Sequence, residues 1–450
     1  MHEFVAQDRE ALNDIAAWTA ARLSDPSAVP AYGRAGEPGT GAEPLPALAS
    51  EGIGTDAAWA WVRDAVLPTA FATDHPRYLA FVGGAPTPAA VLTDAALSAA
   101  SVYGGSELEA GTVVTAERAA LGWLCAFLGY PAEAHGAFVS GGSLANLSAL
   151  VAARHGRRTA AGAPPGVIVM SASAHASVRA AAAIMGCEVV PAGTADGRLR
   201  AADLAPVLDA HDPDDVVAVV ASAGATNTGA VDALAEIAAL CAEREVWLHV
   251  DAAYGGAAML SPCHREAFAG IERADSITID PHKWLFTPYE CAAILYRDPH
   301  RARAAHRQRA EYLEAAHEAA DNPADYAVHL TRRARGLPLW ASLLANGTDA
   351  YVDAVEQCLT TAGYAAKQIE ASPTLELATA PQLSVVLFRR TGWGAAEYEQ
   401  WSQAARRSGL GLVTPTTFGD EPVLRLCFVN PRTTATDVDL LLMSLKDDLP

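Results

Sequence analysis

The stretch that decides the fold reads Asp275-Ser-Ile-Thr-Ile-Asp-Pro-His-Lys-Trp-Leu285. Its β-branched, apolar part, residues 276–279, is typical of a strand buried in a sheet, and Lys283 follows just past the expected strand end. Of the 32 lysines and arginines in the chain, only three are lysines, at positions 283, 367 and 446. Because an amine can attack a carbonyl and form a Schiff base, whereas a guanidinium stays protonated, Lys283 is a candidate covalent nucleophile. The alternative is an ordinary lysine at a strand end.

Similar apolar runs alternate with helical segments between residues 115 and 295. The runs cover residues 137–139, 166–170, 187–191, 215–220, 245–250, 276–279 and 291–296. Short continuous apolar runs that alternate with helices favour a mostly parallel sheet covered on both faces. The last run follows the lysine segment as closely as a hairpin partner would, so one antiparallel strand is expected. The fold class is therefore α/β, with a mostly parallel seven-stranded sheet.

The two ends of the chain differ from this central part. A Pro/Gly-rich connector at residues 25–53 follows an N-terminal helix, and residues 300–335 have helical propensity broken at Asp321-Asn-Pro323. After residue 355 the pattern predicts strands at 383–389 and 423–429 and a closing helix at 434–447, which indicates a small α+β domain. A chain of 450 residues exceeds one compact core. The predicted domains are an N-terminal helical segment (1–80), a large domain (81–352) and a small C-terminal domain (353–450); the family resemblance described below implies that the first packs on a partner subunit and the second binds the cofactor.

Composition excludes several classes of function. A net charge of −20 repels phosphate backbones and anionic lipid, so nucleic acid and membrane surfaces are not expected partners. No apolar run reaches the roughly 18 residues of a membrane span, and the first residues are acidic and polar, unlike a secretory signal. The seven cysteines are scattered and lack Cys-x-x-Cys spacing, which predicts reduced thiols in a cytoplasmic protein, with neither disulfides nor a metal site.

Polar residues follow three other predicted strands. Asp251 ends the run at 245–250, where α/β sheets place ligand contacts, although such a residue also serves as a helix cap or turn. Ser140-Gly-Gly-Ser143 opens a helix and could bind an anion with free N–H groups, or could be a simple turn. His175 also lies just past a strand; it could stack on a planar ring or be structural.

Four ordered motifs carry a family resemblance. They are Phe138-Val-Ser-Gly-Gly-Ser-Leu-Ala-Asn-Leu147, Ser173-Ala-His-Ala-Ser-Val178, His249-Val-Asp-Ala-Ala-Tyr254 and the lysine segment. Together they resemble the group II amino-acid decarboxylases that depend on pyridoxal phosphate (PLP), the family of aromatic-L-amino-acid, histidine and glutamate decarboxylases. The resemblance extends from His75-Pro76 to Asn430-Pro-Arg-Thr-Thr434. It implies fold type I, like aspartate aminotransferase, and a homodimer whose sites lie at the interface.

The resemblance also implies roles for individual residues. Lys283 would bond to the cofactor, Asp251 would pair with the pyridine nitrogen and His175 would stack on the ring. The other cofactor-binding residues it implies are Gly142, Ser143, Thr226, Ala253, Asp280 and His282. Asp280 stands where many members carry asparagine, and an acidic group near a phosphate is electrostatically unfavourable, so its role is open.

A tyrosine on a mobile loop supplies a proton after CO₂ leaves in this family. The matching residue is Tyr312, with Tyr326 as the alternative, and tyrosine rather than phenylalanine favours an amine product over an aldehyde. Predicted substrate residues are Phe81, Tyr103 and Gly347; the surrounding segments differ from those of the aromatic enzymes. We expect decarboxylation of an aromatic or bulky aliphatic L-amino acid. The alternatives are an oxidative decarboxylase that forms an aldehyde, another PLP-dependent carbon–carbon lyase, and a PLP-binding protein without catalysis.

Overall fold

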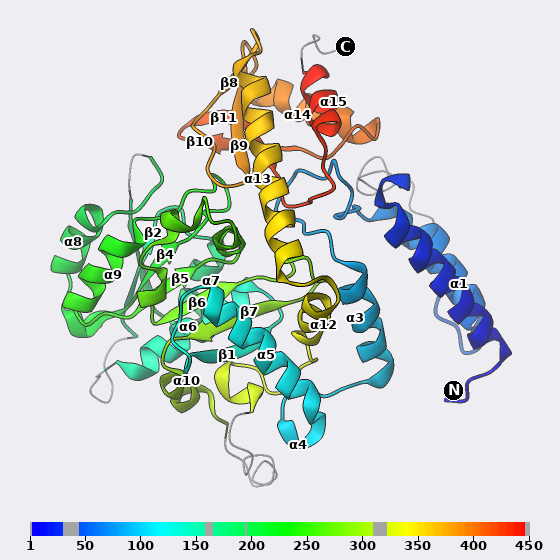
Figure 1. Cartoon of the computed structure of the whole chain (residues 1–450), viewed down its shortest axis with the longest axis horizontal. Helices are drawn as coiled ribbons and strands as arrows, with labels where there is room; N and C mark the ends of the chain where they lie inside the picture. The colour runs from blue at the N-terminus through cyan, green and yellow to red at the C-terminus, as the bar shows by residue number, and fades with distance from the viewer. Residues whose placement is uncertain (1, 30–44, 158–164, 194–195, 309–321, 446–450) are drawn as a thin grey trace.

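A seven-stranded sheet forms the centre of the molecule (Figure 1). The computed structural model describes residues 2–29, 45–157, 165–193, 196–308 and 322–445. The strand order is β1-β7-β6-β5-β4-β2-β3, and β7 is antiparallel to both neighbours while every other adjacent pair in β6-β5-β4-β2-β3 is parallel. The strands are β1 His135–Val139, β2 Val167–Ser171, β3 Glu188–Ala192, β4 Val216–Ser222, β5 Leu248–Asp251, β6 Ser276–Ile279 and β7 Ala292–Tyr296. The predicted sheet, with its single antiparallel member, is confirmed.

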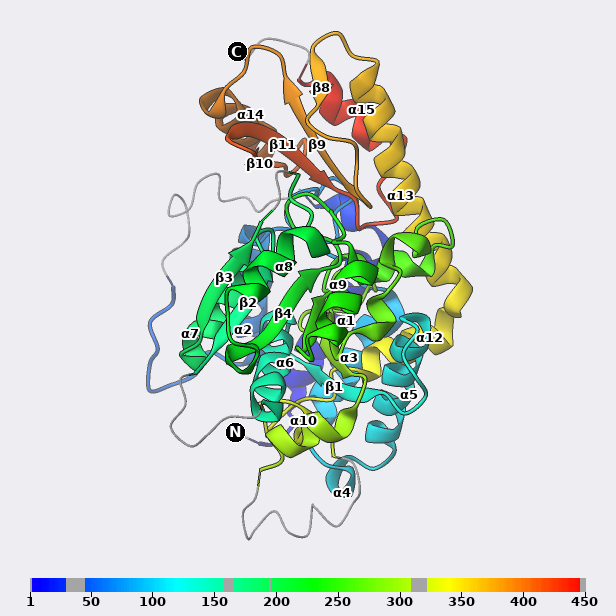
Figure 2. The same ribbon diagram turned by 90° about the vertical axis from the view of Figure 1, so that its left-hand side faces the viewer.

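Both faces of this sheet are buried, which explains its continuous apolar runs. In β7, Ala293 and Leu295 pack in one apolar cluster, while Ile294 and Tyr296 pack in another on the opposite face. Figure 2 shows β2 and β4 between α7 on one side and α9 on the other. The helices around the sheet are α3 Pro88–Ala100, α4 Glu107–Ala110, α5 Thr112–Phe127, α6 Gly142–Gly156, α7 Ala176–Met185, α8 Ala201–Asp209, α9 Leu234–Glu243, α10 Pro299–His306 and α12 Leu337–Asn346.

The strand directions bring the polar loops together. Because β7 is antiparallel to both β1 and β6, β1 runs the same way as the parallel strands. The carboxyl ends of β1, β2, β4, β5 and β6 therefore meet at one edge of the sheet. Ligands of open α/β sheets bind at such an edge. The loops that follow these five strands carry the residues singled out above.

A second, antiparallel sheet lies in the C-terminal part, in the order β10-β11-β9-β8. Its strands are β8 Leu375–Leu377, β9 Val385–Arg390, β10 Thr414–Phe418 and β11 Glu421–Cys427, and its helices are α13 Thr348–Glu370, α14 Ala395–Arg407 and α15 Ala435–Met443. The small α+β unit is confirmed, although only β9 and β11 were predicted as strands. Helix α13 runs from the level of the large sheet to the small one (Figure 1). The predicted domain boundary after residue 352 falls within α13.

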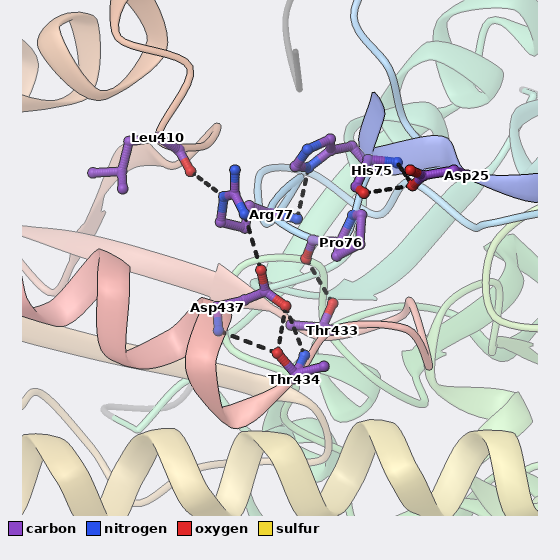
Figure 3. A network of polar contacts seen from close by, with 9 residues as sticks. Asp25, His75, Pro76, Arg77, Leu410, Thr433, Thr434 and Asp437 are labelled. Carbon is purple, nitrogen blue, oxygen red and sulfur yellow. Dashed lines mark hydrogen bonds and ion pairs between the residues drawn. The ribbon is translucent and has the colours of Figure 1, made fainter. Parts of the chain in front are cut away.

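Residues 75–77 are tied to the C-terminal part by a polar network (Figure 3). The guanidinium of Arg77 donates to the carbonyl of Leu410 at 2.5 Å and to the carboxylate of Asp437 at 3.1 Å. The hydroxyl of Thr433 donates to the carbonyl of Pro76 at 2.7 Å. A few residues further on, Gly84 lies against the backbone of Lys283, so the network joins the C-terminal unit to the chain beside that lysine.

Two N-terminal helices, α1 Ala6–Ser24 and α2 Thr55–Trp61, lie on the side of the molecule away from α8 (Figure 1). The indole of Trp59 donates to Asp14 at 2.7 Å and holds α2 against α1. Helix α1 buries only Ala11 and leaves Leu12 54% exposed. None of the helices in the described ranges is both long and apolar enough to cross a membrane.

Candidate active site

A pocket of about 280 Å³ lies at the carboxyl edge of the large sheet. It is lined by all nine residues predicted to bind the cofactor: Gly142, Ser143, His175, Thr226, Asp251, Ala253, Asp280, His282 and Lys283. They come from the loops after β1, β2, β4, β5 and β6. Residues separated by up to 141 positions in the sequence, from Gly142 to Lys283, therefore share one cavity.

Lys283 forms an ion pair inside this pocket. Its Nζ lies 2.9 Å from Oδ2 of Asp280. Burial by itself lowers the pKa of the Lys283 ammonium, but attraction to Asp280 and to Asp251 outweighs burial, and the pKa is raised above its usual value. Without cofactor the amine is therefore held in its charged, non-nucleophilic form.

Asp251 is the last residue of β5 and is 9% exposed. Its Oδ2 accepts a hydrogen bond from Nδ2 of Asn146 at 2.9 Å, and its Oδ1 accepts one from the backbone N–H of Ala253 at 3.1 Å. The two interpretations offered from the sequence both apply: the carboxylate caps the turn that follows β5, and it also faces the pocket. Two donors keep this buried carboxylate satisfied without a cationic partner.

His175 likewise serves two purposes. It is the N-cap of α7, where Nδ1 accepts a hydrogen bond from the backbone N–H of Ser177 at 3.2 Å. The hydroxyl of Ser177 lies 2.8 Å from the same nitrogen. The imidazole is thereby fixed at the pocket wall by the helix that it caps.

The N-terminus of α6 forms an anion-binding corner. Gly142 and Ser143 are its first residues, and their N–H groups have no acceptor within the helix. A Cβ built on Gly141 would meet nothing within 4 Å, so open space lies next to this corner. At Gly142 a Cβ would come within 2.9 Å of Oδ2 of Asp280, so only glycine lets the two segments approach.

Asp280 is the unusual member of the pocket. It is 2% exposed, and its Oδ1 has no hydrogen-bond partner among the described residues. His282 Nε2 lies 3.7 Å from Oδ2 of Asp280, yet burial lowers the pKa of His282, which favours the neutral imidazole. Among the described residues, the charge that balances Asp280 is therefore that of Lys283.

These groups fit pyridoxal phosphate. The pocket holds an amine for a carbonyl group, a satisfied buried carboxylate for a ring nitrogen, and a helix N-terminus with open space for a phosphate. The acidic Asp280, which lies beside the N-terminus of that helix, opposes a phosphate there.

Sequence reasoning missed other residues that line the pocket, among them Asn146, Ser177, Ser222, Gly224 and Tyr254. A signal existed for Asn146, because it falls one helical turn after Gly142 and so lies on the same face of α6. Tyr254 stacks on Trp284 with ring centroids 5.5 Å apart, a contact that no local pattern encodes.

The predicted substrate residues do not line the pocket. Phe81 is 56% exposed, the Tyr103 hydroxyl donates to the carbonyl of Leu330 at 3.3 Å, and Gly347 caps the end of α12. Tyr312 lies outside the described residues. The alternative, Tyr326, is buried with its ring 5.1 Å from that of His135, at the start of β1.

Comparisons with known proteins agree with this geometry. A family model described as the pyridoxal-dependent decarboxylase conserved domain matches residues 58–391. The chain is 32% identical over 395 residues to an aromatic-L-amino-acid decarboxylase of Bacillus atrophaeus, covering 83% of this chain and 81% of the relative. It is 34% identical over 417 residues to an L-2,4-diaminobutyrate decarboxylase of Rhizobium meliloti (strain 1021), covering 89% of this chain and 82% of the relative.

The solved structures that match include the glutamate decarboxylase domain of a Vibrio parahaemolyticus diaminobutyrate-pyruvate transaminase and L-2,4-diaminobutyrate decarboxylase. That domain is 27% identical, with a TM-score of 0.78 and coverage of 89% of this chain and 86% of the other. The fold also matches Oryza sativa TDC, solved with PLP and tryptamine, at 24% identity and a TM-score of 0.87, covering 99% of each chain.

Proposed function

Because the chain belongs to the group II PLP-dependent amino-acid decarboxylases, we propose that it decarboxylates an L-amino acid with an aromatic or bulky aliphatic side chain and releases the amine and CO₂. The observation that carries the proposal is the meeting of Lys283 and Asp251 in one buried pocket at the carboxyl edge of the sheet. PLP, the cofactor of this family, supplies an electron sink when its ring nitrogen stays protonated.

Five of the residues that line the pocket have a proposed task. With PLP bound, the Lys283 amine would hold its carbonyl carbon, and Asp251 would keep a proton on its ring nitrogen. The imidazole of His175 would lie against the ring and exclude water, while Gly142 and Ser143 would hold the phosphate with backbone N–H groups.

The pocket favours substrates without an acidic side chain. No arginine is among the described residues that line it, so a second substrate carboxylate would lack a bidentate partner. The similarity to a diaminobutyrate decarboxylase supports a second candidate, an amino acid with a cationic side chain, which the acidic Asp280 would tolerate.

A panel assay tests the substrate. The purified enzyme with PLP is offered aromatic, branched aliphatic, diamino and acidic amino acids, and the released CO₂ and amine are both measured. We expect the highest kcat/KM with an aromatic or branched aliphatic substrate and the lowest with glutamate and cysteine sulfinate. Preference for diaminobutyrate would select the second candidate, and release of CO₂ from none of them would contradict the proposal.

Tyr312 is proposed as the residue that protonates the substrate carbon after CO₂ leaves. Tyr312→Phe should lower amine formation by a factor of about 10² or more, the range expected for loss of a general acid, while aldehyde, ammonia and oxygen consumption appear. Tyr326→Phe is the matched control, since that ring is buried against β1 rather than in the pocket. Amine formation at the unaltered rate in Tyr312→Phe would place the donor elsewhere, with His175 the next candidate.

We also propose a cytoplasmic homodimer with the sites at its interface. The exposed apolar side chains of Phe4, Leu12 and Ile15 on and near α1 suit contact with a second copy, as do Leu48 and Ile53 before α2. In such a dimer Tyr103 and Gly347 could reach the pocket of the other subunit. Light scattering should give twice the chain mass of 46.8 kDa, and deletion of residues 1–54 should give a monomer without activity. A fully active monomer would contradict this proposal.

A further inference from the structure

A chain of hydrogen bonds runs through the large sheet behind Asp251. The indole Nε1 of Trp247 lies 2.9 Å from Oγ of Ser276, which lies 2.9 Å from Nδ1 of His249. Nε2 of His249 lies 3.0 Å from Oδ1 of Asn146, whose Nδ2 lies 2.9 Å from Oδ2 of Asp251. The first four side chains belong to residues no more than 5% exposed, so each needs its partners inside the protein.

The direction of this chain follows from the group at its Asp251 end. The carboxylate of Asp251 can only accept, so the NH₂ of Asn146 faces Asp251 and the amide oxygen faces Nε2 of His249. An amide oxygen can only accept, so Nε2 of the imidazole carries the proton. In the neutral ring Nδ1 then accepts from the hydroxyl of Ser276, whose oxygen accepts in turn from the indole N–H of Trp247.

A branch of the same chain reaches His175. The second N–H of Asn146 points to Oγ of Ser177 at 3.0 Å, and that hydroxyl is left to donate to Nδ1 of His175 at 2.8 Å. The backbone N–H of Ser177 also donates to this nitrogen. Nδ1 of His175 is therefore an acceptor, and the proton of the neutral ring lies on Nε2.

The imidazole within this chain stays neutral. Burial lowers the pKa of His249 to about 4, against the opposing attraction of Asp251 and a hydrogen bond with the Ser276 backbone, so the imidazole carries one proton at neutral pH.

We propose that Asn146 is a positioning residue that holds both cofactor-facing groups at once, and that it sets the direction of the hydrogen bonds that run back through His249 to Trp247. One amide thus orients the Asp251 carboxylate and the Ser177 hydroxyl that faces Nδ1 of His175. The meaning of this for catalysis rests on the proposed function, in which both groups face the cofactor ring. The hydrogen-bond directions themselves do not depend on it.

The first test is ¹⁵N NMR of the histidines in the full-length enzyme without cofactor. At pH 7 His249 should show the neutral tautomer with the proton on Nε2, and Nδ1 of His175 should show the chemical shift of a hydrogen-bond acceptor. Trp247→Phe removes the indole donor but keeps an aromatic face for Arg301, whose guanidinium lies 4.2 Å from the indole ring. In this variant His249 should keep its proton on Nε2, because Asn146 still faces that nitrogen, whereas Asn146→Ala should make His249 a mixture of tautomers. A proton on Nδ1 of His249 in the unmodified enzyme would overturn the proposal.

The second test measures pyridoxal phosphate affinity and the pH at which the absorbance of the bound cofactor changes. Asn146→Ala should weaken affinity by about 10- to 100-fold, as expected for losing hydrogen bonds to a buried charge, and should move the absorbance transition. Asn146→Asp keeps the shape but sets a second carboxylate against Asp251, so its affinity should improve as the pH falls and one carboxyl group takes up a proton.

Asn430→Ala is the matched control, because Asn430 is a buried asparagine whose amide donates to the carbonyl of Asp74 at 2.9 Å, away from the pocket. It should lower the melting temperature and leave cofactor affinity unchanged. Equal losses of stability in Asn146→Ala and Asn430→Ala, with affinity and absorbance unaltered in both, would overturn the positioning role. If even the unmodified enzyme failed to bind pyridoxal phosphate, the proposed function would fail, while the histidine tautomers would still decide the hydrogen-bond chain.

Discussion

The residues predicted for the cofactor side of the site and those predicted for the substrate side lie in different parts of the molecule. All nine predicted cofactor residues line one pocket at the carboxyl edge of the large sheet. Phe81, Tyr103 and Gly347, predicted for the substrate side, lie outside its lining. The difference follows from chemistry: cofactor binding needs a few polar groups at strand ends, which short motifs display, whereas a substrate cavity needs the shape made by distant segments.

This contrast predicts that changes on the cofactor side abolish turnover, while changes on the substrate side alter the choice of substrate. Lys283→Ala should have the largest effect. It should lose the covalent bond to the cofactor and lower activity by about three orders of magnitude or more. Borohydride reduction followed by peptide mass analysis should mark Lys283 in the unmodified enzyme. Lys367→Ala, in α13, is the control and should be unaffected. A mass tag on Lys367 or Lys446 would end the assignment.

Asp251→Asn should have the next largest effect. The amide cannot hold a proton on the ring nitrogen, so decarboxylation should fall by roughly 10²-fold or more while the fold persists and the cofactor binds more weakly. Turnover, the melting temperature and cofactor affinity are measured together. Near-normal turnover would mean that Asp251 only caps the turn after β5, through its bond to Ala253.

Asp280→Asn should have a smaller effect, and it should favour reaction with the cofactor where the two changes above impair it. The attraction of Asp280 raises the pKa of Lys283 against the lowering effect of burial, and only the neutral amine can bond to the cofactor. Removing the charge should lower that pKa, so reconstitution with pyridoxal phosphate should be about tenfold faster at neutral pH, and its pH profile should shift to lower pH. Loss of the unpaired Oδ1 charge should also tighten phosphate binding. The rate of absorbance change on adding cofactor is the measurement, and an unshifted profile would contradict the ion pair's role.

Some strands and contacts could be predicted from the sequence, and others could not. The close spacing of β6 and β7 was enough to predict their antiparallel pairing, and the buried runs of the parallel strands were visible because both faces are covered. Strand β10 was missed because it contains Pro415, which is tolerated there since β10 is an edge strand. The hydrogen bonds from Trp247 to Asp251 join separate elements, so no single motif shows them.

Phe81 is the substrate-side residue whose position invites a test. Its carbonyl accepts a hydrogen bond from Arg425 at 2.9 Å, and the same guanidinium donates to the carbonyl of Thr226 in the pocket at 2.6 Å. Three residues later, a Cβ on Gly84 would lie 2.0 Å from the carbonyl oxygen of Lys283. The backbone around Phe81 is therefore fixed next to the pocket, while its ring is 56% exposed.

Phe81→Ala should give the smallest effect and the clearest division between the two sides. Cofactor affinity and absorbance should stay unchanged, because the backbone carbonyl that Arg425 binds remains. The kcat/KM ratio between aromatic and small aliphatic amino acids should fall by about five- to tenfold, since one partly exposed apolar contact distinguishes substrates by about 1 kcal/mol. Phe71→Ala, another exposed phenylalanine, should leave the ratio unaltered. If Phe81→Ala weakened cofactor binding as strongly as it changed selectivity, the two sides would not be separable. If it changed neither, the substrate side would have to be sought on the second subunit, around Tyr103 and Gly347.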